Sequence, residues 1–171
     1  MRYLSTMANY NTWANLRIFE LCAGLNNYEY RLDRKSFFGS IHRTLNHILL
    51  VDILWLTRLK GEEPRSIESL DQILYEDFDE LRTERIRQDQ ELTEFCLNID
   101  SSELSKTLKY CRIDGSHCEG VMEDFIATLF NHQTHHRGQI HAMLTQSGIP
   151  NSDMPDLDVV DYLADSALIS R

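Results

Sequence analysis

Four of the chain's seven histidines lie in one stretch, residues 131–148, whose sequence is NHQTHHRGQIHAMLTQSG. The stretch contains no proline, and apolar residues just before it recur at helical spacing. The pattern predicts one long helix over 121–146, with Gly148 as a C-terminal cap. Imidazole is the commonest metal ligand among side chains, so these histidines are candidates for a metal site. The alternative is a cluster of core histidines satisfied by hydrogen bonds.

Two of these histidines, His132 and His136, lie on one face of the predicted helix. At about 100° per residue they are separated by about 40°, and Gln139 falls within about 20° of His132. Residues four apart are neighbours on a helix, so the two imidazoles can converge on one ion. For such a pair we favour metal binding over core packing. Arg137 is expected to point out into solvent.

The other histidines are not expected to be ligands. His141 points to the opposite side of the helix, and His135 lies about 60° from His132. His42 points away from the ligand face of its own predicted helix, and His117 falls in a loop. The predicted site therefore excludes all four.

A third ligand is available in a second apolar stretch, LNHILLVDILWL, within a helix predicted over 37–60. His47 lies in this stretch, and alone it would more often be a core histidine. Beside the pair at 132 and 136 it becomes the natural third ligand. Three neutral imidazoles leave a fourth position for water or substrate, as in catalytic zinc sites. The neighbours of His47 on its helix face are Ser40, Arg43, Thr44, Val51, Leu54 and Arg58.

No general base accompanies the three histidines on their helix faces. Zinc peptidases carry Glu directly after the first histidine of the helical pair, whereas this chain has Gln133. Asp52 projects about 140° from His47, and Asp124 lies about two turns before His132. A thiolate is itself the nucleophile and needs no separate base, whereas hydrolysis usually requires one. The residues therefore favour thiol transfer, unless the first helix or the tail supplies a carboxylate.

The apolar periodicity predicts an all-α fold, a four-helix bundle with long helices over 5–23, 37–60, 75–97 and 121–146. A polar loop is expected over 25–35 and a short helical turn over 66–74. The charged string TERIRQDQE, residues 83–91, is expected to be solvated. Asn11 lies beside the apolar stripe of the first helix, where we favour an inter-helix hydrogen bond over a pocket contact.

Residues 101–119 predict a small hairpin or extended crossover between the third and fourth helices, because LKYCRI alternates and Asp114-Gly115 is a turn signal. Cys111, His117 and Cys118 gather in this segment. A second metal site there lacks a fourth ligand, so small buried thiols are favoured. The tail predicts a short acidic helix that packs on the bundle through three apolar residues, Leu157, Val160 and Leu163.

Length and charge narrow the functional classes. The 171 residues suit a single domain, residues 1–171, with a sizeable core. The formal net charge of −10 argues against nucleic acid and anionic membranes as partners. No apolar run is long enough to span a membrane, and residues 1–15 lack a signal-peptide core. Four cysteines without regular spacing indicate a reducing compartment, so the cytoplasm is expected.

Three strings resemble the DinB/YfiT-like family of damage-inducible, metal-dependent proteins: YNTWAN (10–15), FFGSIHRTLNHILLVD (37–52) and NHQTHHRGQIHAMLTQSG (131–148). The resemblance covers nearly the whole chain in order, and its HxxxHRGQ string is specific. It implies a four-helix bundle in which three histidines from two helices bind a divalent metal. Carried over by position, those ligands are His47, His132 and His136.

The resemblance also implies a function. Some relatives are thiol-dependent transferases or isomerases, and many have no known activity. A metal-dependent thiol transferase or hydrolase acting on a small molecule is expected, with Asn11 and Gln139 as pocket contacts and no organic cofactor. Zn or Ni is favoured as the metal, and Fe, Co or Mn also suits three histidines. The alternatives are a non-catalytic stress-response bundle that binds metal, and an interaction module whose histidines are core residues.

A homodimer is expected on the same basis. Members of the family are often dimeric, and the chain carries more large aromatic side chains than one narrow core stripe needs. These are Trp13, Phe37, Phe38 and Trp55.

Overall fold

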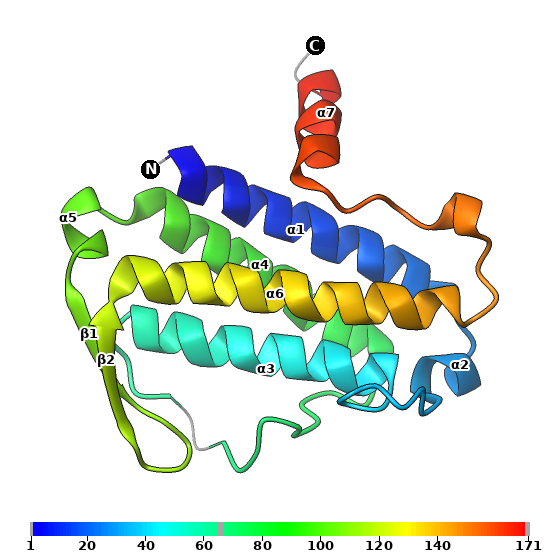
Figure 1. The fold of residues 1–171 in the computed structure, drawn as a ribbon, viewed down its shortest axis with the longest axis horizontal. Helices are drawn as coiled ribbons and strands as arrows, with labels where there is room; N and C mark the ends of the chain where they lie inside the picture. Colours follow the sequence, from blue (N-terminus) through cyan, green and yellow to red (C-terminus); the bar gives the residue numbers. More distant parts are fainter. Residues whose placement is uncertain (1, 65–66, 170–171) are drawn as a thin grey trace.

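A computed structural model describes residues 2–64 and 67–169, and its described part is mostly helical (Figure 1). Helix α1 packs against α4 and α6, and α3 packs against α6 and α4. Each of these long helices matches one of the four that the periodicity predicts. Their bounds are α1 (Arg2–Ala23), α3 (Ile41–Leu59), α4 (Phe78–Asn98) and α6 (Met122–Thr145).

The helix ends follow from local chemistry. Ser40 caps the start of α3, where its Oγ accepts a hydrogen bond from the amide of Arg43 at 3.2 Å. The side chain of Asp77 caps α4 in the same way. Gly148 has a φ of 82°, a left-handed conformation that glycine adopts without strain, just beyond the end of α6. The C-cap of α6 is Gln146, so the predicted glycine lies two residues beyond the cap.

Shorter elements complete the described chain. The predicted hairpin is confirmed as strands β1 (Thr107–Cys111) and β2 (His117–Val121), which pair antiparallel with Cys111 opposite His117. Its turn contains Gly115, at a φ of 82°. The remaining elements are α2 (Asn27–Arg31), α5 (Ser101–Leu104), the 3-10 helix η1 (Asn151–Asp153) and α7 (Val159–Ile169). None of the described helices is both long and apolar enough to cross a membrane.

Loop predictions are less accurate than helix predictions. The expected loop over 25–35 contains α2, whose start is capped by the side chain of Asn26. The helical turn expected over 66–74 begins at a residue outside the described chain. Over 67–74 the structure has one turn, in which the amide of Gln72 donates to the carbonyl of Ser69 at 3.3 Å.

The tail forms α7 as expected, but it packs differently. Leu157 contacts the core, and Tyr10 of α1 donates a hydrogen bond to its carbonyl at 2.7 Å. Val160 and Leu163 are 68 % and 49 % exposed, so the prediction that they pack on the other helices is wrong. Helix α7 projects away from the long helices in Figure 1, and it contacts α1.

The buried side chains form two apolar clusters separated along the helices by a polar layer. One cluster surrounds Leu56, Leu92 and Ile126, and the other surrounds Leu49 and Ile140. Each long helix contributes buried polar residues at the positions between its two apolar segments. The members of this polar layer are Asn11, Asn15, Asp52, Arg85, Gln88, Asp89, Gln133 and Arg137.

The polar layer overturns two expectations about charged residues. Arg137 is 3 % exposed rather than pointing out, and it donates to the side-chain oxygens of Asn11, Asn15 and Gln133. Part of the string 83–91 is buried as well, because Arg85 pairs with Asp52 at 2.7 Å and with Asp89 at 2.8 Å. Helical periodicity does not reveal such side chains, since their burial depends on partners from other helices.

Candidate metal centre

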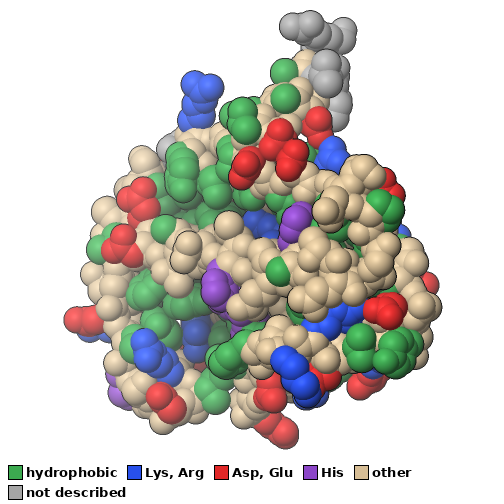
Figure 2. All heavy atoms as spheres, turned by 45° about the vertical axis from the view of Figure 1, so that its right-hand side comes forward, with side chains coloured by type: hydrophobic (Ala, Val, Ile, Leu, Met, Phe, Trp, Pro, Cys, Tyr) green, Lys and Arg blue, Asp and Glu red, His purple; other side chains and the backbone are tan. Residues whose placement is uncertain are grey.

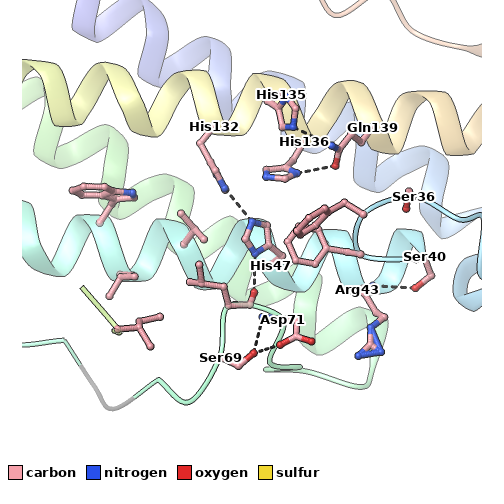
Figure 3. A pocket seen from close by; sticks show the side chains of 18 of the residues that line it. Ser36, Ser40, Arg43, His47, Ser69, Asp71, His132, His135, His136 and Gln139 are labelled. Carbon is pink, nitrogen blue, oxygen red and sulfur yellow. Dashed lines mark hydrogen bonds between the residues drawn. The ribbon is translucent and has the colours of Figure 1, made fainter. Parts of the chain in front are cut away.

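Three histidines from α3 and α6 converge at the wall of one cavity (Figure 3). One ring nitrogen from each of His47, His132 and His136 lies within 4.8 Å of the others. The closest pair is His47 Nε2 and His132 Nε2, at 3.0 Å. The structure therefore brings together the three histidines that the spacing and the resemblance select.

Two of the rings are oriented by hydrogen bonds on the side away from the cluster. His47 Nδ1 lies 2.7 Å from the carbonyl oxygen of Leu70, and His136 Nδ1 lies 2.9 Å from Gln139 Oε1. Both partners are oxygens that only accept, so each Nδ1 carries the hydrogen of its neutral ring. This leaves Nε2 of each ring as the lone-pair nitrogen, which is how metal-binding histidines are usually held.

Burial keeps the three rings neutral. It lowers the pKa of His47 to about 4 and that of His132 to about 3, and it lowers the pKa of His136 in the same direction. Neighbouring imidazoles add to the effect at His132 because two positive charges would repel at this distance. At neutral pH the cluster is therefore in the form that coordinates a metal ion.

The surroundings of the third ring, His132, indicate that a cation fits between the imidazoles. Among the described residues, the buried Nδ1 of His132 has no hydrogen-bond partner. If the hydrogen of His132 is on Nε2, it can bond to His47, and Nδ1 becomes a buried acceptor without a donor. If the hydrogen is on Nδ1, two Nε2 lone pairs face each other across 3.0 Å. A cation shared by those lone pairs removes the repulsion, so the donor set fits a divalent metal.

Comparison with known proteins identifies the family of this chain. Residues 1–164 match the model of the DinB family. The chain belongs to the DinB family. It is 28 % identical to Protein DinB of Bacillus subtilis (strain 168) over 145 residues, which cover 81 % of this chain and 83 % of that relative. Both histidine-bearing helices lie inside the matched residues.

The cavity of this DinB-family protein has a volume of about 1710 Å³. Phe38 lines it beside the three histidines, and its ring stacks on His47 with centroids 3.9 Å apart. Figure 2 shows histidine side chains on one face of the molecule, with hydrophobic and basic side chains beside them. All three imidazoles of the cluster line the cavity.

The other histidines lie outside the cluster, and three of them have clear surroundings. Gln139 Nε2 donates to His135 Nε2 at 3.0 Å, and His42 Nε2 bonds to the carbonyl of Tyr75 at 3.1 Å. His117 is exposed on β2. Among residues 2–64 and 67–169, His47, His132 and His136 are the one group of metal-binding side chains close enough to share an ion.

The cysteines of the hairpin differ from the expectation of buried thiols. Cys111 is exposed and Cys118 is half-buried, since the hairpin lies at the edge of the molecule with one face toward solvent. They form no metal-binding group with His117 among the described residues.

Of the two predicted pocket contacts, Gln139 lies at the cavity and Asn11 does not. Gln139 lines the cavity and holds the His136 ring. Asn11 does not line the cavity. It is buried in the polar layer, where it donates to Asp89 at 3.2 Å and accepts from Arg137. The inter-helix hydrogen bond is therefore the correct interpretation of Asn11, and the pocket contact is wrong.

A loop supplies two contacts that sequence reasoning missed. The segment after α3 brings the Leu70 carbonyl to His47 and the Asp71 carboxylate to the cavity wall. The charge of Asp71 acts to raise the pKa of His47, although burial outweighs it. The sequence offers no signal for either contact, because one is a backbone atom and the other depends on the path of an irregular loop.

Proposed function

We propose that this DinB-family protein is a four-helix bundle that binds a divalent metal through His47, His132 and His136. We further propose that it transfers a low-molecular-weight thiol, or water, to a small electrophile in the adjoining cavity. The observation that carries the proposal is the convergence of three neutral imidazoles at a cavity wall, with two rings oriented from behind by Leu70 and Gln139.

A divalent metal in this position would lower the pKa of a water or thiol bound beside the imidazoles. The protein's contribution is orientation. Leu70 and Gln139 fix the directions of the two Nε2 lone pairs, and Phe38 shields the His47 ring from solvent. Three imidazoles suit Zn or Ni, and Fe, Co or Mn are also compatible with them.

Thiol transfer is favoured over peptide hydrolysis by the surroundings of Gln133. This residue occupies the position of the zinc-peptidase glutamate, but it is buried and donates to Asp52 in the polar layer. In thiol transfer, the thiolate sulfur bonds to the electrophilic carbon and the leaving group departs with its bonding pair. The thiol proton passes to solvent, so no protein base is required.

Asp71 favours a second candidate function, transfer of water. Asp71 lines the cavity that contains the histidines. One oxygen of its carboxylate accepts a hydrogen bond from the Ser69 hydroxyl, and the other could accept the proton of an attacking water molecule. Asp71→Asn separates the two candidates. We expect it to lower a hydrolytic rate by about 100-fold or more and to leave thiol transfer unchanged.

We also propose that the protein is a homodimer. Phe37, at the mouth of the cavity, is 85 % exposed, and α7 leaves Val160 uncovered, so apolar surface is available for a second copy. Light scattering at micromolar concentration should give twice the mass of one chain. A single-chain mass would contradict this proposal.

The decisive experiment on function has two steps. Elemental analysis of protein purified without chelator or affinity tag should find one metal ion per chain, and His47→Ala should lose it. Metal-loaded and chelated protein are then screened with small thiols and electrophiles. Absence of any bound metal would refute the site, whereas bound metal without any transfer would support the non-catalytic alternative.

A further inference from the structure

One face of α3 forms a continuous floor of the cavity. It begins at Arg43, continues through His47 and the apolar side chains of Val51, Leu54 and Trp55, and ends at Arg58. These residues share a face because they are spaced by three or four positions. Arg58 lies eleven residues after His47, about 16 Å along the helix axis. The cavity is therefore elongated, with imidazoles at one position and a guanidinium at another.

Arg58 is unusually well buried for a cation, at 8 % exposure. Its guanidinium lies over the rings of Tyr110 and Trp55, 4.5 Å and 5.3 Å from their centroids. One nitrogen, Nη2, donates to the carbonyl of Cys111 at 2.8 Å. The buried Nε has no hydrogen-bond partner among the described residues, which is also true of Nε in Arg34, Arg85 and Arg137. Burial also lowers the pKa of the guanidinium, which is the effect of leaving a charge partly desolvated.

The other buried arginines of this chain have more side-chain partners than Arg58. Arg137 donates to three side-chain amide oxygens. Arg85 pairs with two carboxylates, and Arg34 pairs with Glu29. Within residues 2–64 and 67–169, no carboxylate forms an ion pair with Arg58, although the chain has ten more acidic than basic residues. A buried charge is unfavourable unless it is paired, so the geometry leaves a place for an anion from outside the chain.

We propose that Arg58 is the anion subsite of the cavity and that the substrate is an elongated molecule with a carboxylate at one end. The reactive end would lie at the histidines, the apolar middle would cover Val51, Leu54 and Trp55, and the carboxylate would bind Arg58. This inference rests on the proposed function for the reactive end only. A planar guanidinium that lies against two aromatic rings suits a planar carboxylate.

The surroundings of Arg58 support this assignment. Arg112 also lines the cavity and adds a second positive charge near the hairpin. Asp114 lines the same part, but its carboxylate accepts hydrogen bonds from the amide and hydroxyl of Ser116, at 2.9 Å and 2.6 Å. The acidic group is thereby engaged in the turn of the hairpin.

Binding of octanoate and 1-octanol tests the subsite. These probes share an apolar chain and differ in charge, and neither contains a thiol. Titration calorimetry is performed on chelated protein, so that the carboxylate of octanoate cannot bind a metal ion at the histidines. We expect octanoate to bind at least about tenfold more tightly than octanol, because the ion pair forms in a partly buried site. Arg58→Gln should abolish this preference. Arg43→Gln makes the same charge change elsewhere on the cavity wall and should retain it.

A second measurement uses the unaltered protein and does not depend on the folding of a variant. The NMR resonance of the Arg58 Nε–H group should shift on addition of octanoate and stay in place with octanol. Equal binding of the two probes, equal losses in both variants, or no shift would overturn the anion subsite. The metal plays no part in these measurements, so a failure of metal binding would refute the proposed function and leave this result standing.

Discussion

Two of the three clustered imidazoles are held from behind by hydrogen bonds of different kinds. His47 is held by a backbone carbonyl from a loop, and His136 by a side chain in the next turn of its own helix. His132 has no such partner on Nδ1 among the described residues. The protein thus orients two rings in advance, while the third depends on the ion or on solvent.

The first prediction concerns ligand identity. His136→Ala should remove one of three ligands and lose bound metal, while helix content stays native because the ring lies at a cavity wall outside the two apolar clusters. Metal analysis and circular dichroism of the same sample check both parts. The matched control is His141→Gln, which also removes an imidazole from α6 and should leave metal content unchanged. Loss of metal in the control would contradict the assignment of helix faces.

The second prediction concerns pH and chelated protein. In the unfolded chain a histidine takes up its proton near pH 6.5, whereas His47 and His132 stay neutral in the fold to about pH 4 and 3. Between these pH values the unfolded state binds more protons than the folded state. The contribution of the two histidines to the free energy of unfolding is therefore complete above pH 6.5 and declines as pH falls.

Urea unfolding of the original chain and of His132→Gln, from pH 7 to pH 4, checks this contribution. The quantity compared is the change in the free energy of unfolding with pH. Burial raises the pKa of Asp52 to about 6, so this carboxyl makes the folded state more stable as pH falls over part of the range. Asp52 is present in both proteins, so its effect cancels in the comparison. The free energy of unfolding should therefore depend less steeply on pH in His132→Gln than in the original chain. Identical slopes would show that the buried imidazoles are not neutral in the fold.

At the scale of elements, the polar layer links all four long helices. The carboxylates of Asp52 and Asp89 come from α3 and α4, and the guanidiniums of Arg85 and Arg137 come from α4 and α6. Asn11 of α1 connects α4 and α6, because it donates a hydrogen bond to Asp89 and accepts one from Arg137. Because each buried charge needs partners from other helices, the layer favours one alignment of the helices along their axes.

The third prediction follows from this layer. Arg85→Met should leave two buried carboxylates without their cation and lower the free energy of unfolding by about 3–5 kcal/mol. Arg87→Met lies in the same helix, but it removes exposed pairs with Glu84 and Glu91 and should change stability by about 0.5 kcal/mol or less. Denaturant unfolding measures both. Similar values for the two variants would mean that the buried layer contributes no more than surface charge.

At the scale of the whole molecule, the apolar clusters and the three histidines occupy different parts of the fold. The two apolar clusters extend over all four long helices, whereas the three histidines lie at a cavity wall on α3 and α6. Burial can therefore maintain the fold without an ion, unlike a small zinc finger that unfolds when its metal is removed.

The fourth prediction is that chelated protein remains folded. Its far-ultraviolet circular dichroism should match that of the metal-loaded protein, and it should unfold cooperatively at a lower temperature. Metal binds only the folded state, so free metal at a hundredfold excess over Kd should add about 2.7 kcal/mol to the free energy of unfolding. A chelated protein that is unfolded at room temperature would make the site structural and favour the non-catalytic alternative.

The sequence by itself determined the long helices, the hairpin and the three histidines. Helical periodicity is local, and His132 and His136 share a face because four residues make about one turn. The turn at Asp114-Gly115 is equally local, since glycine accommodates the positive φ. These features need no knowledge of which helices become neighbours.

Only the tertiary structure decided which polar groups are buried and what surrounds the metal centre. Arg137 and Asp89 have charged side chains that periodicity assigns to solvent, yet each finds partners on another helix. The path of a loop brings the Leu70 carbonyl to His47 and brings Asp71 to the cavity wall. The physical reason is the same in each case: a polar group can be buried once its partner is close by, and that proximity arises from packing between segments far apart in the sequence.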